Sequence, residues 1–301
     1  MSDLSVIIVN WNTRELLAQC LHSVYNTAGD LSLEVFVVDN ASTDGSAAMV
    51  RERFPQVRLI ENAENVGFAR ANNQAIRLAT GRYVLLLNSD TRALSGALSS
   101  LVDFMDAHPQ AGAAGARLLN ANGTLQPSCH RMLTPWREFW RLLYLEHMHR
   151  TVTYPMGSWD VRSPRAVEVI KGACLMVRHA ALVQVGLLDE SYFMYTEEVD
   201  LCYRLRRAGW LLYWVPLAQV IHYGEASSRQ VAEAMFVQLY RSKVQFYRKT
   251  GGEARARLFR RLVYLAYLPR VALGYVASLP SVAWRARTRT YRRLLAELGC
   301  M

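Results

Sequence analysis

The chain has 301 residues, 51% of them hydrophobic, which is enough for one sizeable α/β core with a smaller appendage but not for two large independent domains. Its five cysteines are odd in number and never form a CxxC pair, which excludes a disulfide framework and a zinc ribbon. The chain begins without a basic segment, and the apolar run over residues 6–9 is too short for a signal peptide. We therefore expect a protein that stays in a reducing compartment.

The net charge of +10 is concentrated at one end of the chain. Residues 241–301 carry fourteen Lys or Arg and two Asp or Glu, a net charge of +12, whereas the other 240 residues carry 21 and 23, a net charge of −2. A near-neutral body with a cationic, aromatic-rich tail is typical of contact with anionic lipid headgroups. A merely solvated helical face is the alternative, and we expect no nucleic-acid partner.

The first 90 residues alternate between short apolar strands and amphipathic helices. The periodicity predicts strands over 4–9, 33–38, 57–60 and 83–87, and helices over 13–25, 46–54 and 68–79. Continuous apolar strands that alternate with helices indicate a parallel sheet covered on both faces.

The middle of the chain is less regular. Residues 127–165 contain four prolines and little periodicity, which indicates a long, partly helical excursion. Beyond it, we predict a strand over 167–177, a helix over 199–208 that ends at Gly209, and a strand over 210–215.

From residue 230 the pattern is helical to the end, with expected breaks near Gly251 and Pro269. The apolar stretch 262–284 contains prolines and an arginine, so a helix that lies on a membrane is favoured over one that spans it. The prediction is a catalytic domain over residues 1–229 and a helical, basic, membrane-associating segment over residues 230–301.

Polar residues follow three of the predicted strands directly: Asn10, the pair at 39–40 and the triplet at 88–90. In parallel sheets, ligands bind beyond the carboxyl ends of the strands. We therefore expect these three clusters to line one crevice.

The cluster at residues 39–46 leads from a strand into a helix. A carboxylate at a strand end can accept hydrogen bonds from a base or ribose, and a helix start favours anionic groups. Asp39 comes too early to cap the helix, so ligand contact is favoured for it. For Asp44 and Ser46, helix capping is the alternative.

Residues 65–73 form a turn into a helix with several amides and one cation. Gly67 would permit close approach of the backbone to a ligand, and Arg70 could reach a diphosphate. Alternatively, Asn65 is a helix cap and Arg70 a solvated helix residue.

Asn88, Ser89 and Asp90 end the strand at 83–87 with oxygen ligands. A leaving diphosphate has about two negative charges to be neutralised, and a hard divalent cation held by one or two oxygen ligands does this. Asp90 suits that role. A turn in which Asp90 bonds its own backbone is the alternative.

Glu197, Glu198 and Asp200 place three carboxylates at a predicted helix start. Mutual repulsion there can raise the pKa of one carboxyl group, as a general base requires. Alternatively, these are favourable first-turn charges. His222 follows an apolar strand and is either a metal ligand or a packed histidine.

With its segments in this order, the chain resembles family 2 glycosyltransferases of the GT-A fold, in particular rhamnosyltransferase-like bacterial enzymes that build cell-surface polysaccharides. The resemblance covers roughly residues 4–228 and depends on seven segments, at 6–12, 37–46, 65–69, 86–90, 171–176, 193–201 and 220–222. It implies an α/β fold, a GT-A type Rossmann-like sandwich with a mostly parallel central sheet, here followed by a helical C-terminal extension.

The resemblance also implies roles for individual residues. Asp39 would contact the base or ribose, Asp90 would bind Mg²⁺ or Mn²⁺ at the family's Asp-x-Asp position, and His222 would add a ligand. Together with the reasoning from the residues themselves, the predicted donor-binding residues are Asn10, Thr13, Asp39, Asp44, Asn65, Gly67, Arg70, Asn88 and Ser89, and the predicted catalytic residues are Glu198, Glu197 and Asp200.

The sequence departs from the family pattern twice. Asn88 replaces the first aspartate of the metal motif, and Glu197-Glu198 replaces Glu-Asp. Glu198 stands where the family usually has its aspartate base, but the second departure leaves open which glutamate is the base.

The implied activity is inverting transfer of a sugar from a nucleotide-diphosphate donor, a dTDP- or UDP-sugar with dTDP-rhamnose as first choice, to a hydroxyl acceptor. The basic tail suggests that this acceptor is a lipid-linked saccharide. The implied location is the cytoplasmic, inner face of the plasma membrane, and a homo-oligomer is compatible with the sequence. A sugar nucleotidyltransferase would need a Gly-rich loop with a lysine near the N-terminus, where residues 10–20 offer only Arg14. A non-catalytic nucleotide-sugar binder or membrane scaffold is the third alternative, against which Asp90, Glu198 and His222 argue.

Overall fold

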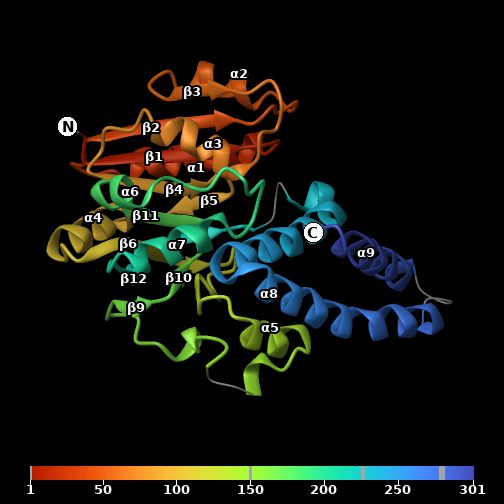
Figure 1. The fold of residues 1–301 in the computed structure, drawn as a ribbon. Helices are drawn as coiled ribbons and strands as arrows, with labels where there is room; N and C mark the ends of the chain where they lie inside the picture. The colour runs from red at the N-terminus through yellow and green to blue at the C-terminus, as the bar shows by residue number, and fades with distance from the viewer. Residues whose placement is uncertain (1, 149–150, 225–227, 278–281) are drawn as a thin grey trace. The chain divides into compact units, whose positions relative to one another are not determined.

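The computed structural model describes residues 2–148, 151–224, 228–277 and 282–301, which fold into two compact units (Figure 1). The first unit comprises residues up to Met132 together with Pro155–Phe193 and Glu197–Arg229. The second comprises Leu133–Tyr154, Met194–Thr196 and Gln230–Met301.

A ten-stranded, mixed sheet forms the centre of the first unit, with the order β3-β2-β1-β4-β11-β6-β12-β5. Its parallel half contains β1 (Leu4–Asn10), β2 (Leu33–Asp39), β3 (Arg58–Glu61) and β4 (Tyr83–Asn88). The other strands of that order are β5 (Thr91–Ala93), β6 (Ala111–Leu119), β11 (Cys174–Arg178) and β12 (Leu211–His222). Two short strands pair at its margin, β7 (Leu125–Gln126) with β6 and β9 (Arg165–Val167) with β12. Separately, β8 (Cys129–His130) pairs with β10 (Val169–Ile170).

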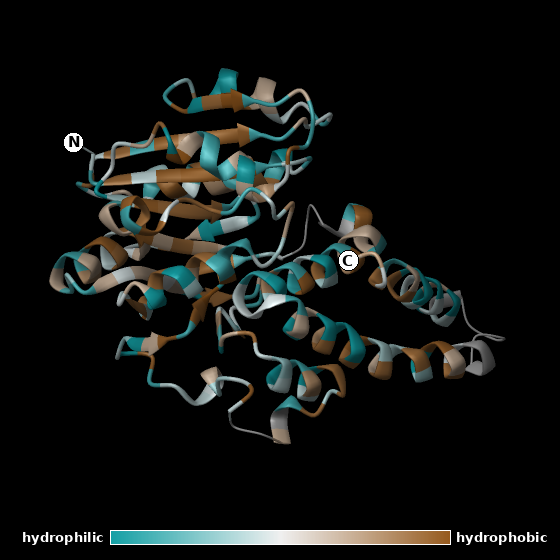
Figure 2. Cartoon of the chain, viewed as in Figure 1, coloured by the Kyte–Doolittle hydropathy of each residue, from teal (hydrophilic) through white to brown (hydrophobic). Residues whose placement is uncertain are grey.

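Helices cover both faces of this sheet because its strands are apolar on both sides. Side chains of alternate residues in β1, such as Val6 and Ile8, pack in one core with α1 (Arg14–Asn26), α2 (Ser46–Arg53) and α4 (Ala97–Ala107). The intervening residues point to the opposite face, against which α3 (Phe68–Ile76), α6 (His179–Val185) and α7 (Glu197–Arg207) pack. Figure 2 shows the resulting concentration of apolar residues in the strands.

The first 90 residues confirm the predicted alternation to within a few residues at each boundary. The strand predicted over 167–177 was wrong, because three separate strands occupy it, with a turn at residues 171–173. In that turn the Lys171 N–H donates to the Ser128 carbonyl, and the Ala173 carbonyl accepts from the Asn88 N–H, so the backbone leaves one ladder to join another. Helices α4 and α6 were not predicted.

The second unit consists of long helices: α5 (Pro135–Leu142), α8 (Ala232–Ala277) and α9 (Val282–Leu298), with short 3₁₀ turns. The predicted break at Gly251 is confirmed, since Gly251 and Gly252 have non-helical dihedrals within α8. The break predicted at Pro269 was wrong. The backbone dihedrals remain helical there, and Pro269 and Leu265, four residues earlier, are exposed, so the carbonyl that loses its partner can bind water.

A buried ion cluster joins α5 to α8. Glu138 is 1% exposed, and its carboxylate accepts from Lys243 Nζ at 2.7 Å and from Arg141 Nη1 at 3.0 Å. Nearby, the hydroxyls of Tyr240 and Tyr267 hydrogen bond at 2.6 Å. Within the described ranges, no helix combines the length and the apolar character that crossing a membrane requires.

Candidate active site

The carboxyl ends of β2, β1 and β4 meet at one edge of the sheet. In the parallel register, Asn10 pairs with Asp39, and Val9 pairs with Asn88. The three strand-end clusters therefore lie side by side, as the strand-end rule predicts.

A continuous hydrogen-bond network links these strand ends. Asn10 Nδ2 donates to Asp39 Oδ1 at 3.1 Å, while Asn10 Oδ1 accepts from Thr13 Oγ1 at 2.6 Å. Thr13 Oγ1 also lies 2.8 Å from Ser89 Oγ. All four side chains are at least nine-tenths buried, so this edge is a fixed polar surface rather than a set of mobile side chains.

The loop after β2 is held by its own polar groups. Ser42 N–H donates to Asp39 Oδ2 at 2.9 Å, and Ser42 Oγ accepts from Asn10 Nδ2 at 3.0 Å. Asp44 Oδ1 accepts from the Ser46 N–H at 3.0 Å and Asp44 Oδ2 from the Arg14 N–H at 2.8 Å. Asp44 is not the helix cap, since Gly45 occupies that position, but it binds the first residue of α2 and also fixes the start of α1.

Backbone conformation at this edge is unusual. Among the described non-glycine residues, positive φ occurs at Asn12 (53°), Ala41 (64°), Tyr195 (68°), Thr196 (74°) and one other position. The first two flank the network at Asn10 and Asp39, and the last two directly precede α7. Such strained residues concentrate at functional sites, where the surrounding structure enforces them.

Asn65 and Gly67 stabilise the turn into α3. Asn65 is not the helix cap, since Gly67 occupies that position, and its Oδ1 accepts from the Gly67 N–H at 3.0 Å and from Asn40 Nδ2 at 2.8 Å. Gly67 has φ 85°, and a Cβ there would lie 2.4 Å from the carbonyl oxygen of Phe193. The close approach that requires glycine is therefore to the backbone at Phe193, whose carbonyl also accepts from the Phe68 N–H at 2.7 Å.

Arg70 is exposed on α3. The pKa of Glu190 is lowered by hydrogen bonds from Asn73 and Arg77 and, to a smaller extent, by the charge of Arg70. Arg70 therefore lies near Glu190, and none of the hydrogen bonds or ion pairs found in the described residues joins it to Asp90 or Ser89.

Asp90 and His222 are adjacent although 132 positions separate them in the sequence. His222 ends β12, and its Nε2 lies 3.3 Å from Asp90 Oδ1 and 3.4 Å from Asn88 Nδ2. The antiparallel pairing of β12 with β5, which places His222 opposite Thr91, creates this proximity.

The donor set at this point fits a divalent cation. A carboxylate oxygen and an imidazole nitrogen converge at one place; Mn²⁺ accepts both ligand types, whereas Mg²⁺ prefers the oxygen. Within the described residues, no cluster of three or more His, Cys, Asp or Glu side chains is arranged to hold a metal ion. A cation at Asp90 and His222 would therefore have most of its coordination positions available for phosphate oxygens and water.

Glu197 and Glu198 begin α7 in different surroundings. Glu197 is 4% exposed, and its Oε2 has no hydrogen-bond partner among the described residues. Burial, and then the neighbouring Glu198 carboxylate, raise the pKa of Glu197 well above its ordinary value. Glu198 is less completely buried than Glu197, although its Oε2 atom is itself buried, so the two glutamates differ in the degree of burial.

Asp200 is fully buried on the next turn of α7, where its Oδ2 accepts from Arg204 Nε at 2.7 Å. The remaining nitrogens of Arg204 donate to the carbonyls of Val185, Gly186 and Leu187. The bonds from Arg204 to these carbonyls anchor α7 to the segment that precedes it, and the ion pair with Asp200 within α7 holds the arginine in place.

The turn at residues 171–173 lies between Glu198 and the metal-ligand cluster. A Cβ at Gly172 would contact Glu198 Cβ at 3.7 Å, and the adjacent Ala173 carbonyl accepts from the Asn88 N–H at 3.1 Å. The turn therefore contacts both Glu198, through Gly172, and Asn88, through the Ala173 carbonyl.

Several residues of the site were not among the predicted site residues, although Ser42, Gly172 and Phe193 lie in segments that carry the family resemblance. Ser42 joins the donor edge, and Gln126 bonds His222 Nδ1 at 2.7 Å from a strand of two residues. The Phe193 carbonyl and Gly172 contribute by backbone position, which side-chain patterns do not reveal.

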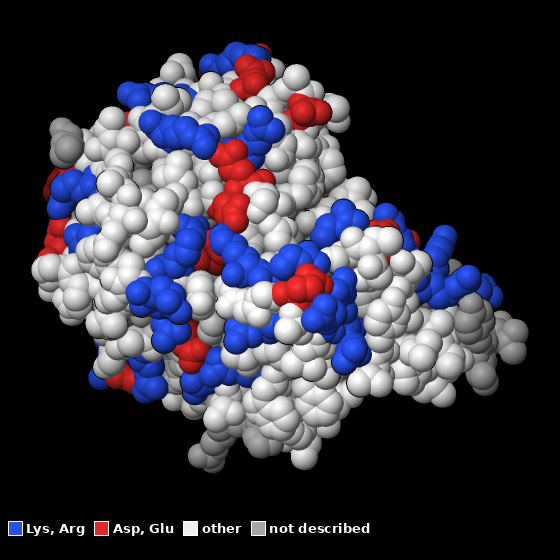
Figure 3. Space-filling model, viewed as in Figure 1, with Lys and Arg blue, Asp and Glu red and all other residues white. Residues whose placement is uncertain are grey.

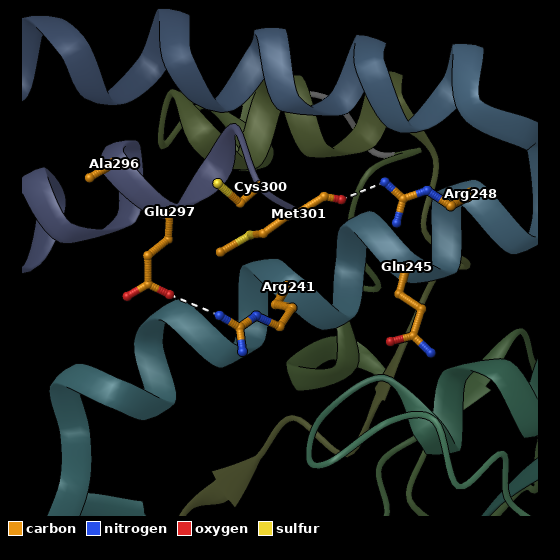
Figure 4. Close-up of a pocket in the computed structure, with 7 residues that line it drawn as sticks. All are labelled: Arg241, Gln245, Arg248, Ala296, Glu297, Cys300 and Met301. Carbon is orange, nitrogen blue, oxygen red and sulfur yellow. Dashed lines mark hydrogen bonds and ion pairs between the residues drawn. The ribbon is translucent and has the colours of Figure 1, made fainter.

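A pocket in the second unit contains no predicted site residue (Figure 4). It lies between α8 and α9, and its two arginines are already paired: Arg241 with Glu297 at 2.9 Å and Arg248 with Glu253 at 2.7 Å. The strand-end site in the first unit therefore remains the candidate.

The chain combines a mixed α/β sheet, polar residues at the carboxyl ends of its parallel strands and an Asp90–His222 pair beside them. This combination is the one expected of a GT-A glycosyltransferase. The family model described as "Glycosyl transferase family 2" matches residues 5–159, and "Glycosyl transferase family group 2" matches residues 83–291. The chain belongs to glycosyltransferase family 2.

Characterised relatives include rhamnosyltransferases. The chain is 32% identical over 245 residues, 74% of its length and 77% of the relative's, to an N-acetylglucosaminyl-diphospho-decaprenol L-rhamnosyltransferase of Mycobacterium tuberculosis. It is 27% identical over 177 residues, 56% of its length and 66% of the relative's, to the rhamnosyltransferase WbbL of Escherichia coli. The rhamnosyltransferase-like character is thereby confirmed.

The fold matches a solved glycosyltransferase structure. The mannosyltransferase PcManGT from Pyrobaculum calidifontis, in complex with GDP-Man and Mn²⁺, aligns with a TM-score of 0.56 at 20% identity, over 98% of this chain and 87% of that chain. This similarity confirms the predicted GT-A fold.

Proposed function

We propose that the protein transfers a sugar, with rhamnose as first choice, from a nucleotide-diphosphate donor to a hydroxyl of a lipid-linked saccharide, with inversion, in cell-surface polysaccharide synthesis. The observation that carries this proposal is the convergence of Asp90 and His222 at 3.3 Å, at the sheet edge that holds Asp39. The turn that contains Gly172 contacts both Asn88, through the Ala173 carbonyl, and Glu198. The names of the mycobacterial and E. coli relatives both support the sugar, and the mycobacterial name, with its diphospho-decaprenol, supports the lipid-linked acceptor.

The donor nucleotide would lie along the edge formed by β2, β1 and β4. Asp39 would accept from the ribose or base, because its carboxylate is held at the strand end by Asn10 and Ser42. Thr13 and Ser89, whose hydroxyls lie 2.8 Å apart, would orient the phosphates toward Asp90, the residue that follows Ser89. Arg70 is exposed and can move, so it would complete the diphosphate site.

Asp90 and His222 would hold Mg²⁺ or Mn²⁺, with Asn88 next to the ligating nitrogen of the histidine. When bound, such a cation neutralises the negative charge that develops on the departing diphosphate. The Mn²⁺ in the PcManGT complex supports a divalent ion in this fold, and the donor set here suits it.

Glu198 would be the general base. It is less buried than Glu197, whose pKa is raised by burial and by the Glu198 carboxylate. The raised pKa means that Glu197 holds its proton more strongly than an ordinary glutamate, which would limit the negative charge beside Glu198. As the acceptor oxygen attacks the anomeric carbon, Glu198 would take its proton and the bond to the diphosphate would break. We place Asp200 outside the chemistry, as an anchor of α7.

The test compares Glu198→Gln with Glu197→Gln. Loss of the base should lower kcat by about 10²–10⁴-fold and leave the Kd of the donor with Mn²⁺ within about threefold. Glu197→Gln replaces a protonated carboxyl by a group of the same shape and should keep most of the activity. If Glu198→Gln turns over like the wild-type protein, the assignment of the base is wrong.

Asp90→Ala tests the cation site separately. Donor binding should lose its dependence on Mn²⁺ and weaken in its presence, while binding without metal should change little. An unchanged metal dependence would contradict the assignment of Asp90. A wild-type protein that binds donors but neither transfers nor hydrolyses them would favour the non-catalytic binder.

A membrane surface is proposed for the second unit. The C-terminal half of α8 exposes Leu265 (71%), Leu268 (61%) and Leu273 (67%), and Arg257 and Arg261 are exposed on the preceding turns. Figure 3 shows Lys and Arg side chains over the α8–α9 part of this unit, next to an uncharged surface over the end of α8. Exposed leucines beside arginines suit insertion among the acyl chains and headgroups of anionic lipids, which would keep the enzyme peripheral at the cytoplasmic face.

Vesicle sedimentation tests this surface. Replacing both Leu265 and Leu268 by Ser should reduce binding to vesicles that contain anionic lipid by about tenfold or more. Each leucine that becomes buried in the membrane on binding contributes about 1.5–3 kcal/mol. Val183→Ser, at an exposed apolar position of α6, is the matched control and should bind like wild type. Equal binding of the double variant would contradict the proposed surface.

A further inference from the structure

His222 has a hydrogen-bond partner on each ring nitrogen side. Its Nδ1 lies 2.7 Å from Gln126 Oε1, and its Nε2 faces Asp90 Oδ1 and Asn88 Nδ2. An imidazole nitrogen binds a metal only through a lone pair, so the position of the ring proton decides whether Nε2 is available.

The amide of Gln126 has one orientation that satisfies its neighbours. Its Nε2 donates to the His222 carbonyl at 3.2 Å and to Asn120 Oδ1 at 3.0 Å, and both of these are acceptors. A flipped amide would place its oxygen against them and lose both bonds. Oε1 therefore faces His222 Nδ1, and Nδ1 must be the protonated nitrogen.

The orientation of Asn120 is fixed by the same logic. Its Nδ2 donates to Thr124 Oγ1 at 2.9 Å, and Thr124 Oγ1 in turn donates to Asn122 Oδ1 at 2.6 Å. Asn122 Oδ1 also accepts from the Thr124 backbone N–H at 3.1 Å, a group that can only donate. The direction of every hydrogen bond from this amide to His222 follows from that one donor.

The turn that carries this chain belongs to the β6–β7 hairpin. The Asn120 N–H donates to the Thr124 carbonyl at 2.8 Å, and the Gly123 N–H donates to the Asn120 carbonyl at 2.9 Å. The Asn120-Ala121-Asn122-Gly123 sequence thus forms a tight, rigid turn whose side chains extend the hydrogen bonding to β12.

We propose that Gln126 is a positioning residue that fixes the Nδ1–H tautomer of His222, so that Nε2 presents its lone pair beside Asp90. The hairpin then prepares the cation site before any cation binds. This inference depends on the proposed role of His222 as a metal ligand. Partners of this kind behind a ligating histidine typically change metal affinity about 10–100-fold.

Two variants separate positioning from packing. Gln126→Leu keeps the approximate volume and removes both the acceptor and the donors. Gln126→Glu keeps an acceptor for Nδ1–H and loses the donors, so it should retain the tautomer. Gln184→Leu, which removes an exposed glutamine bonded to Trp210, is the matched control.

The first measurement is long-range ¹H–¹⁵N correlation of ¹⁵N-histidine-labelled protein without metal, at alkaline pH, with His222 assigned from a His222→Gln spectrum. Wild type, Gln126→Glu and Gln184→Leu should show a protonated Nδ1 at His222, and Gln126→Leu should show a shift toward protonated Nε2. The second is titration with Mn²⁺ and a nucleoside diphosphate, in which Gln126→Leu should raise the Kd of Mn²⁺ about 10–100-fold and Gln126→Glu by much less.

An Nδ1–H tautomer and wild-type Mn²⁺ affinity in Gln126→Leu would overturn the inference. If the tautomer shifts but the wild-type protein itself does not bind Mn²⁺, the positioning role of Gln126 is supported and the metal role in the proposed function fails. The two proposals can therefore fail separately.

Discussion

Glu138 in the second unit and Glu197 in the first are buried to nearly the same degree, 1% and 4% exposed, but the pKa values of their carboxyl groups are shifted in opposite directions. Burial alone would raise the pKa of Glu138, but Lys243 and Arg141 outweigh it and lower the pKa. For Glu197, burial and the Glu198 carboxylate both act upward. The surroundings therefore shift the pKa of the same residue type downward in one unit and upward in the other.

The difference shows what each region is built for. Around Glu138, every charge meets an opposite charge, so the cluster only has to hold α5 against α8. At the start of α7, two carboxylates adjoin each other at the end of a strained loop, an arrangement that costs stability and is typical of functional sites. Substituting these buried carboxyl groups one at a time tests that difference.

Glu138→Gln should have the largest effect on stability. It keeps the side-chain shape but leaves Lys243 and Arg141 without their anion, and breaking a buried pair costs about 3–5 kcal/mol, less here because the two cations are partly exposed. Urea denaturation at neutral pH measures the loss.

The pH dependence provides the check. Because the folded pKa of Glu138 lies below its unfolded value of about 4.5, its contribution is present above that pH and is lost on acidification. The gap between wild type and variant should therefore narrow below pH 4.5. A gap that does not depend on pH would mean that charge is not what Glu138 contributes.

Asp200→Asn should have the next largest effect. Asp200 is the α7 residue that resembles Glu138, a fully buried carboxylate paired with a cation. The variant leaves Arg204 with its three carbonyl acceptors, so we expect a loss of about 2–3 kcal/mol rather than a full broken pair. The Tm of thermal unfolding and the kcat should both decrease. Lost activity with an unchanged Tm would instead return Asp200 to the catalytic residues that the sequence predicts.

The contrast also explains what the sequence can and cannot reveal. The edge containing Asn10, Asp39 and Asp90 could be predicted because each residue ends a strand, and parallel strands bring their ends together. That reasoning needs only local periodicity and one general rule. The strand elements up to residue 88 were predictable for the same reason.

The partners that distinguish the two glutamates lie beyond such reasoning. Glu138 lies in the proline-rich region 127–165, where no periodicity predicts which residues it contacts. Its partner Lys243 comes 105 residues later. Gln126 meets His222 across 96 residues, and the carbonyl of Phe193 determines why residue 67 is glycine. Each depends on tertiary packing, so neither the Glu138 cluster nor the support of His222 could be predicted.

Glu197→Gln should have the smallest and most diagnostic effect. The folded pKa of Glu197 lies above its unfolded value of about 4.5, so the wild-type protein is penalised as pH rises through that value, by up to about 1.4 kcal/mol per pH unit until the folded pKa is reached. Glutamine has the shape of the protonated acid and never ionises. The variant should therefore match wild type near pH 4.5 and become relatively more stable toward neutral pH, in denaturation curves recorded across that range. Glu198→Gln, which removes only the neighbouring charge, should reproduce part of this change. Parallel curves for Glu197→Gln and wild type would mean that Glu197 is ionised in the fold, and the choice of Glu198 as the base would lose its physical reason.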